Sequence, residues 1–353
     1  MAGLYIHIPF CERKCSYCAF YSFAKPWKNV AGFFQALGKE LNSLPADFSP
    51  ETVFIGGGTP TALDLKTLGS FLAMLRKFSP VEFSCEANPG TVDRKKLELL
   101  IKNGVNRLSI GVQSFNSKCL EMLGRIHTAE EAEAAFRLAQ TAGFKNIGLD
   151  LMFGVPGQTI QMLEADIERA LALEPEHISI YNLMYEEGTP LAVRDPERLD
   201  EGLEREMYDL IRRQLAAAGF IHYEISNFAK PGFECRHNLL YWSGGEYIGL
   251  GPAAHSHWRG MRRANVSDVE DYCAGGPRRE FEEILDPEAK ERETLVMGLR
   301  RLAGVEVSVD LFENKKKTFL ALEKEGLLVI SGRHVRLSEE ALFVSDAVFS
   351  ELV

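Results

Sequence analysis

The sequence contains no hydrophobic run that approaches the roughly 20 apolar residues needed to cross a bilayer, and its mean hydropathy is −0.11. The first residues also lack the basic start and apolar stretch of a secretory signal. We therefore expect a cytoplasmic protein without a transmembrane segment. These absences leave open a peripheral contact with a membrane.

Positive charge and cysteine are both scarce. The chain has 40 Lys and Arg against 50 Asp and Glu, a formal net charge of −10. Nucleic-acid binding depends on Lys and Arg that neutralise phosphates, so the charge argues against a nucleic-acid partner. Seven cysteines without an export signal argue against a disulfide framework and favour a metal or redox role for cysteines that cluster.

Short apolar runs alternate with longer helical patterns along the first two thirds of the 353 residues. Strands are predicted at 5–8, 52–55, 81–86, 106–111, 146–152 and 177–182, and helices at 65–78, 93–103, 129–142, 160–173 and 204–218. This alternation predicts parallel βαβ units. Periodicity leaves open a doubly wound sheet or an incomplete barrel, but polar and Gly-rich segments follow the first four strands, where barrel enzymes build their sites. We expect an α/β fold in which residues 1–222 form a partial (β/α)6 barrel of the TIM type.

The remaining chain is predicted to form two smaller parts. The Gly- and aromatic-rich stretch 223–258 shows no helical period, so we expect residues 223–285 to be an irregular connecting lid over the barrel mouth. Residues 286–353 read as helix, helix and hairpin, a small winged-helix-like domain. The acidic balance favours a capping role for it over DNA contact, and Lys315–Lys317 is interpreted as a solvated helix face.

Three of the cysteines, Cys11, Cys15 and Cys18, follow the first strand with the spacing C-x3-C-x2-C. A closed zinc or electron-transfer site uses four ligands, whereas three thiolates on a [4Fe–4S] cluster leave one iron open. An open iron can chelate the amino and carboxylate groups of S-adenosylmethionine (SAM), and an electron from the cluster can break the sulfonium bond to give a deoxyadenosyl radical. Three structural thiols, or a zinc site with His7 as fourth ligand, remain the alternatives.

The chain around these cysteines resembles the oxygen-independent coproporphyrinogen III oxidase-like family of the radical SAM superfamily, and within it the heme chaperone branch. The resemblance covers nearly the whole chain and begins with the motif Tyr5-Ile-His7-Ile-Pro-Phe-Cys11-x3-Cys15-x-Tyr17-Cys18. It implies a radical SAM barrel, an iron–sulfur cluster bound by the three cysteines, SAM as cofactor and a connection to porphyrin biosynthesis.

A glycine run, Gly56-Gly57-Gly58-Thr59-Pro60, follows the second strand, and glycines let the backbone approach a ligand closely. Alone it could be a tight turn, but the family uses such a loop on the methionyl group of SAM. Polar residues at later strand ends could be structural; by resemblance they contact SAM, since acids suit hydroxyl or ammonium groups and arginine suits a carboxylate. The SAM-binding set implied by the resemblance is Tyr5, Tyr17, Gly57, Gly58, Thr59, Glu86, Gln113, Arg125 and Asp150.

Two departures from the oxidase branch favour the chaperone branch. The oxidase motif continues to a fourth cysteine, where this chain has Ala19-Phe20, and the oxidase has an N-terminal extension before its barrel. The chaperone interpretation implies binding of heme and its delivery to a respiratory hemoprotein. The first alternative is oxidative decarboxylation of coproporphyrinogen III to protoporphyrinogen IX, and the second is a different radical SAM reaction on another substrate. Whether the chain is an enzyme therefore stays open.

The run Cys235-Arg-His237-Asn-Leu-Leu-Tyr241-Trp242 matches the HNxxYW motif of the heme-handling branch. Imidazole ligates heme iron, and Tyr and Trp offer flat apolar surface to a porphyrin, so His237 is the candidate heme ligand. The same run could instead pack a lid with His237 hydrogen-bonded internally. Cys235, His255 and His257 are weaker candidate ligands, and Cys85, Cys119 and Cys273 are interpreted as ordinary thiols.

Overall fold

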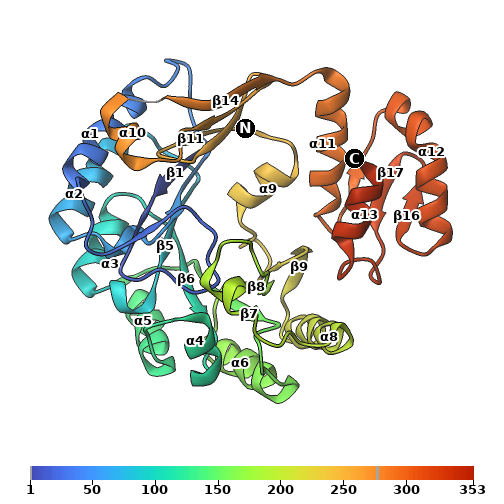
Figure 1. Ribbon diagram of the computed structural model, residues 1–353, viewed down its shortest axis with the longest axis horizontal. Helices are drawn as coiled ribbons and strands as arrows, with labels where there is room; N and C mark the ends of the chain where they lie inside the picture. The colour runs from blue at the N-terminus through green and yellow to red at the C-terminus, as the bar shows by residue number, and fades with distance from the viewer. Residues whose placement is uncertain (1, 276–277) are drawn as a thin grey trace.

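Six parallel strands run through the middle of a twelve-stranded sheet in the computed structural model, which describes residues 2–275 and 278–353 (Figure 1). They are β1 (Ala2–Ile8), β4 (Thr52–Gly57), β5 (Glu82–Ala87), β6 (Arg107–Gln113), β7 (Ile147–Phe153) and β8 (His177–Asn182), each paired with the next in this order. The predicted strands are therefore all present, with ends that differ by a few residues. The sheet curls into an open barrel, as expected.

Helices cover the outer face of this curl (Figure 1). They are α1 (Val30–Asn42), α2 (Leu65–Leu75), α3 (Arg94–Lys102), α5 (Ala129–Ala142), α6 (Ile160–Ala172) and α8 (Glu201–Ala217). Shorter elements follow the carboxyl ends of β6, β8, β4 and β5, respectively α4 (Ser117–Leu123), α7 (Pro190–Arg194) and the 3-10 turns η1 (Pro60–Ala62) and η2 (Pro89–Thr91). Several begin at a side chain that accepts from the free backbone N–H groups, as Asp64 does for α2 and Thr128 for α5.

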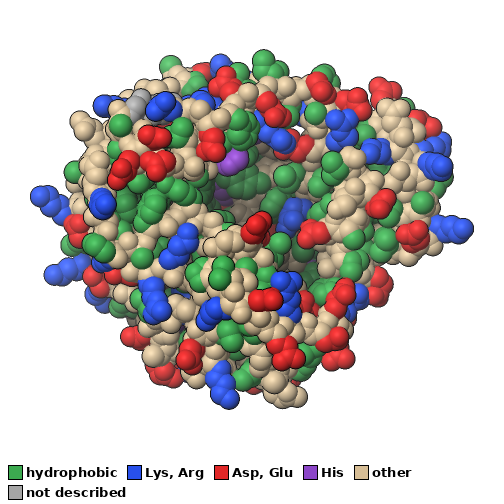
Figure 2. All heavy atoms as spheres, viewed as in Figure 1, with side chains coloured by type: hydrophobic (Ala, Val, Ile, Leu, Met, Phe, Trp, Pro, Cys, Tyr) green, Lys and Arg blue, Asp and Glu red, His purple; other side chains and the backbone are tan. Residues whose placement is uncertain are grey.

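The two faces of the barrel strands differ in chemistry. On β1 the side chains of Leu4, Ile6 and Ile8 are fully buried in the core, and aliphatic side chains repeat at alternate positions along the other strands. The intervening positions on the inner face carry polar and aromatic groups, such as Tyr5 on β1 and Asp150 on β7. Closed TIM barrels fill this space with branched aliphatic side chains. The inner wall here is instead suited to hydrogen bonding, and Figure 2 shows a hollow in the centre of the curl.

The prediction of irregular structure for residues 223–285 is wrong. This segment, together with Ile221 and His222, contains β9 (Ile221–Glu224), β10 (Asn227–Ala229), α9 (Arg236–Trp242), β11 (Glu246–Leu250), β12 (His255–Trp258), β13 (Met261–Asn265), α10 (Val269–Gly275) and β14 (Arg279–Ile284). The strands extend both edges of the sheet: β10 and β9 continue from β8, while β11 pairs parallel to β1 and leads to β12, β13 and β14. These strands have three to six residues, too few to show a periodic pattern, so pairing at the sheet edges determines their structure.

Helix α9 also lies elsewhere than expected, since it covers the amino ends of the barrel strands and not the mouth. A Cβ on Gly3, near the start of β1, would lie 2.6 Å from Leu240 and 3.1 Å from the ring of His237. Thr52, the first residue of β4, contacts the same ring. Figure 1 shows the helix inside the concave side of the sheet. We call α9 and its contacts here the barrel floor.

The C-terminal part has the expected two helices and hairpin with one further helix. It consists of α11 (Pro287–Leu299), β15 (Val305–Glu306), α12 (Val309–Lys324), β16 (Leu328–Ser331), β17 (His334–Leu337) and α13 (Ser345–Leu352). Arg205 and Arg212 of α8 form ion pairs with Glu340 and Glu339, which dock this part beside the barrel. Within residues 2–275 and 278–353, no helix combines the length and the apolar character required to traverse a bilayer.

Candidate functional site

The cysteine loop starts where the small parallel pair β2 (Phe10–Cys11) and β3 (Phe23–Ala24) holds its two ends together. Trp27 donates from its indole to the carbonyl of Cys11 at 2.9 Å. In the middle of the loop, Ser16 donates its N–H to Leu123 O, and its carbonyl accepts from Leu191 N at 2.8 Å. The loop is thus anchored to the ends of α4 and α7 while its thiols remain partly exposed.

Side-chain donors lie next to two of the three thiols. Arg125 Nη1 lies 3.2 Å from Cys15 Sγ, and Thr59 Oγ1 lies 3.6 Å from Cys11 Sγ. Burial raises the pKa of both Cys11 and Cys18, and the nearby thiols raise each of these pKa values further. Among the described residues, no three His, Cys, Asp or Glu side chains converge closely enough to hold a metal ion as they stand. Binding of a cluster by these thiols would therefore require rotation of their side chains.

The donor set nonetheless fits a [4Fe–4S] cluster. The three partly exposed thiols sit on one short loop, and hydrogen bonds to sulfur of the kind seen at Cys11 and Cys15 stabilise cluster thiolates. The zinc alternative fits less well, because both ring nitrogens of His7 are already engaged. Its Nε2 donates to Tyr21 O at 2.8 Å, and its Nδ1 accepts from the Tyr5 hydroxyl at 2.9 Å.

The glycine loop lies against the cysteine loop at the carboxyl end of β4. Gly58 leaves no room for a side chain, since a Cβ would lie 2.8 Å from the backbone N and O of Phe10. Gly57 has φ +105°, and a Cβ there would lie 2.5 Å from the ring of His7. Thr59 is buried, and its hydroxyl accepts from Asn88 Nδ2 at 2.6 Å. Gly57 and Gly58 thus let the loop pack closely against β1 and the start of the cysteine loop.

Two carboxyl groups line the inner wall next to this loop. Glu86 Oε2 accepts from Gly57 N at 3.1 Å, and Asp150 Oδ1 accepts from Ser109 Oγ at 3.0 Å. Burial, and then the nearby Asp150, raise the pKa of Glu86 to about 7, and burial also raises the pKa of Asp150. Two neighbouring acids with incomplete hydrogen bonding can accept from ribose hydroxyls or an ammonium group.

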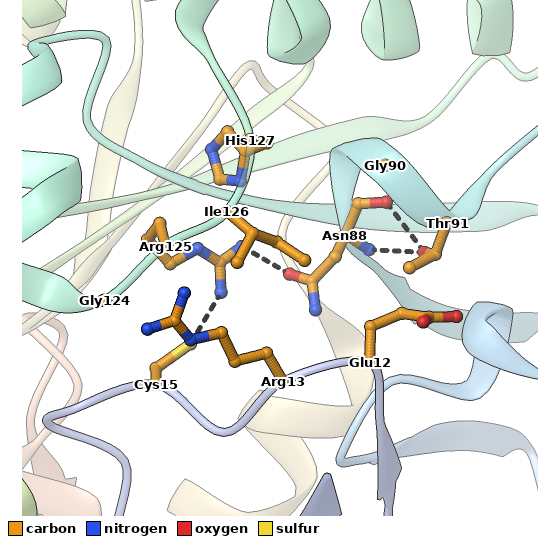
Figure 3. Close-up of a pocket in the computed structure, with 10 residues that line it drawn as sticks. All are labelled: Glu12, Arg13, Cys15, Asn88, Gly90, Thr91, Gly124, Arg125, Ile126 and His127. Atoms are coloured by element: carbon orange, nitrogen blue, oxygen red, sulfur yellow. Dashed lines mark hydrogen bonds between the residues drawn. The ribbon is translucent and has the colours of Figure 1, made fainter. Parts of the chain in front are cut away.

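Arg125 and Asn88 lie beside Cys15 in the pocket next to the cysteine loop (Figure 3), and the side chain of Gln113 lies close to both, around Gly111. Arg125 donates to Cys15 Sγ and to Asn88 Oδ1, while its buried Nε has no protein acceptor. Gln113 ends β6 with φ +70°, where the register against β7 shifts. A left-handed backbone at a non-Gly residue is sterically costly and is often found at functional sites.

The residues predicted to bind SAM lie on or just after β1, β4, β5, β6 and β7, on the side of the sheet that carries the cysteine loop, and Arg125 of this set lines the pocket beside Cys15. Tyr17 packs against a buried cluster that includes Leu123 and Leu191, and burial raises its pKa. Asn88 was missed, although it lies only two residues after Glu86 and joins Thr59 to Arg125. Its place just beyond the end of the third predicted strand was the signal that could have identified it.

His237 lies at the barrel floor, away from the cysteine loop. Its ring is 1% exposed, and its two nitrogens lie 2.8 Å from Thr52 Oγ1 and 2.8 Å from the Tyr241 hydroxyl. It stacks on Phe54 with 5.3 Å between ring centroids, and burial lowers its pKa to about 3. The imidazole is neutral, but it can reach an iron only if one of these hydrogen bonds opens and α9 moves.

The weaker heme-ligand candidates lie in two places, at the start of α9 and on β12. Cys235 is buried at the start of α9, where its thiol points to Glu82 Oε1 at 3.6 Å and burial raises its pKa to about 12. His255 and His257 are on β12, two strands beyond β1 in the sheet. The structure therefore does not bring these residues into one ligand set with His237.

Comparison with known proteins agrees with the cysteine and glycine motifs. Residues 5–170 match the family model of the radical SAM superfamily. The chain is 39% identical to heme chaperone HemW of Bacillus subtilis, covering 99% of this chain and 98% of that protein, and 34% identical to HemW of Mycobacterium tuberculosis, covering 99% and 94%. The structure superposes with a TM-score of 0.87 on coproporphyrinogen III oxidase (HemN) of Escherichia coli, at 21% identity over 99% of this chain and 89% of that one, which shows a shared fold. The chain belongs to the radical SAM superfamily and, within it, to the HemW family.

Proposed function

We propose that this protein is a cytoplasmic heme chaperone that binds heme, a [4Fe–4S] cluster and SAM and passes the heme to a respiratory hemoprotein. The observation that carries the proposal is full-length similarity to proteins named heme chaperones, combined with a cysteine loop that ends at three thiols. Where the oxidase branch has a fourth cysteine, this chain has Phe20, whose side chain is 71% exposed.

Cys11, Cys15 and Cys18 would hold the cluster, which supplies an open iron and one electron. Thr59 and Arg125 would stabilise the cysteine thiolates through their hydrogen bonds to sulfur. The SAM set would surround the nucleotide: the backbone at Gly57 and Gly58 next to its methionyl end, Glu86 and Asp150 towards hydroxyl or ammonium groups, and Arg125 towards its carboxylate. Tyr5, Tyr17, Thr59 and Gln113 would complete this set.

Heme binding rests on the HNxxYW run and on the apolar side chains near the mouth. Ile126, Met184 and Val193 belong to segments that follow the carboxyl ends of the strands, and they are 58%, 62% and 78% exposed. Exposed apolar side chains of this size suit the flat face of a porphyrin. Because His237 is enclosed at the floor, we propose that it ligates the iron only in a conformation in which α9 has moved.

The test is a heme titration and a coproporphyrinogen III assay on one anaerobically reconstituted sample that contains SAM and a reductant. We expect a Soret band that saturates with heme and no protoporphyrinogen. Formation of protoporphyrinogen would overturn the chaperone proposal in favour of the oxidase.

His237→Ala tests the ligand, with His222→Ala as matched control, because His222 is also largely enclosed but stacks on Phe228 at the other edge of the sheet. We expect a weaker or shifted Soret band for His237→Ala alone. An unchanged spectrum would show that His237 is not a heme ligand. The chaperone proposal itself would still be decided by the heme titration of the wild type.

A further inference from the structure

A second pocket lies on the outer side of the sheet and shares no lining residue with the pocket beside the cysteine loop. It is formed where the C-terminal end of α1 meets β11 and the hairpin β12–β13, and we call it the α1–β13 pocket. Its polar lining comes from Glu40, Ser43, Trp258, Arg263 and Arg279, with Leu44, Pro45 and Leu250 supplying the apolar walls.

Glu40 has no hydrogen-bonding capacity left for a further donor. Its carboxylate is 2% exposed and accepts four hydrogen bonds: Oε2 from Gly251 N at 2.9 Å and Tyr272 OH at 2.8 Å, and Oε1 from Asn265 Nδ2 at 2.8 Å and Arg279 Nη1 at 3.3 Å. A carboxylate has about four lone-pair positions, so this acceptor is saturated. Glu40 therefore neutralises Arg279 and cannot also serve Arg263.

Two donors in the pocket remain without an acceptor. Trp258 Nε1 and Arg263 Nε are both buried from solvent and have no hydrogen-bond partner among the described residues. Neither group can accept a hydrogen bond, so each needs an acceptor from outside the protein. An unmade hydrogen bond of a buried donor costs roughly 1–3 kcal/mol, and more for a charged group.

Arg263 also differs from the arginines around it in its charge balance. Arg259 pairs with Asp47, Arg262 with Glu293 and Arg279 with Glu40, whereas no ion pair of Arg263 is present in the described part of the chain. Its cross-strand neighbour Glu282 lies on β14 but beyond ion-pair distance. With Arg279 and Arg263 against Glu40 alone, the lining carries one net positive charge in a protein whose net charge is −10.

From this geometry we propose that the α1–β13 pocket binds a small oxyanion of the phosphate type through Arg263 and Trp258. A phosphate oxygen accepts from both guanidinium and indole N–H groups and supplies the missing negative charge. Such an ion would join the hairpin β12–β13 to α1, since its donors and its walls come from both. The proposal is independent of heme binding.

Isothermal titration of the full-length protein with inorganic phosphate tests the site. We expect saturable binding that Arg263→Gln weakens by about tenfold or more, the loss expected for a hydrogen bond to a charged group. Arg262→Gln is the matched control: it removes the same charge from the adjacent position of β13, and its effect should stay below about twofold because Arg262 pairs with Glu293 and does not line the pocket.

Trp258→Phe keeps an aromatic side chain but lacks the indole N–H, and it should weaken binding by a smaller factor than Arg263→Gln. Phosphate should also raise the melting temperature of the wild type and of Arg262→Gln but not that of Arg263→Gln. A parallel titration with glycerol 3-phosphate distinguishes a phosphate ester from the free anion as the tighter ligand. Absence of binding at millimolar phosphate, or equal losses in Arg262→Gln and Arg263→Gln, would overturn the proposal and leave water as the acceptor.

Discussion

Replacement of Glu86 by glutamine should make the cluster-free protein more stable at neutral and alkaline pH. The Glu86 carboxyl is enclosed beside Asp150, and its pKa is raised from 4.5 to about 7. Between these values the folded protein binds more protons than the unfolded chain, so wild-type stability falls as pH rises through this window. Glutamine keeps an oxygen for the N–H of Gly57 but carries no charge, so the variant should not show this loss.

The size of the effect follows from the shift. A difference of about 2.5 pKa units corresponds to about 3 kcal/mol at 1.36 kcal/mol per unit, fully developed above about pH 7 and absent below about pH 4.5. Unfolding entropy of about 2.1 cal/mol/K per residue gives about 0.7 kcal/mol/K for a cooperative chain of this length. The melting temperature of Glu86→Gln should therefore exceed that of the wild type by about 4 °C at pH 8 and converge with it near pH 4.5.

Thermal melts followed by circular dichroism across this pH range provide the measurement. Glu98→Gln is the control, because Glu98 is 53% exposed on α3 and its replacement should give no pH-dependent difference. A melting-temperature difference for Glu86→Gln that does not vary with pH, or a variant less stable than the wild type at pH 8, would refute the reasoning. The same change should weaken SAM binding, so stability and ligand affinity should move in opposite directions.

Three further substitutions test other parts of the structure. Glu40→Ala should lower the free energy of unfolding, measured by chemical denaturation, by about 3–5 kcal/mol, because four donors lose a buried charged acceptor. Tyr272→Phe removes only one of these donors and should lower it by about 1.5–3 kcal/mol. Equal effects of the two substitutions would contradict this account. Gly58→Ala should lower the melting temperature and the iron content after reconstitution, because its Cβ would meet the backbone of Phe10 at 2.8 Å, and a wild-type melt would show that the loop can relax. Cys15→Ser should abolish the visible absorption of the reconstituted cluster, because an alkoxide replaces thiolate poorly; retention of full iron and sulfide would mean that the ligands are misassigned.

The sequence was sufficient to predict the central sheet and much of the site. Runs such as 106–111 and 146–152 mark buried parallel strands, and the carboxyl ends of parallel strands meet at one edge, so Glu86, Gln113 and Asp150 could be grouped before the structure was known. The family resemblance supplied their roles. The left-handed backbone of Gln113 could not be predicted from the sequence, because no local sequence pattern indicates a positive φ at a glutamine.

The segment after residue 222 was predicted less well for a physical reason. Strands such as β10 and β12 have three or four residues, and their pairing with distant strands gives no periodic signal. The position of α9 could not be predicted from the sequence either, because it depends on contacts between residues far apart in the chain. Gly3 leaves space for its side chains, and Glu82 accepts from the N–H groups of Arg236 and His237 at its start.

The attachment of α9 limits how often the imidazole of His237 can be free. Glu82 receives hydrogen bonds from two N–H groups and the thiol of Cys235, and the imidazole makes two more. At roughly 1 kcal/mol each, these five keep the released conformer to on the order of one molecule in several thousand. A metal that depended on this imidazole would bind with its apparent affinity reduced by the same factor. Any interaction that releases α9 would then control how readily His237 binds a metal.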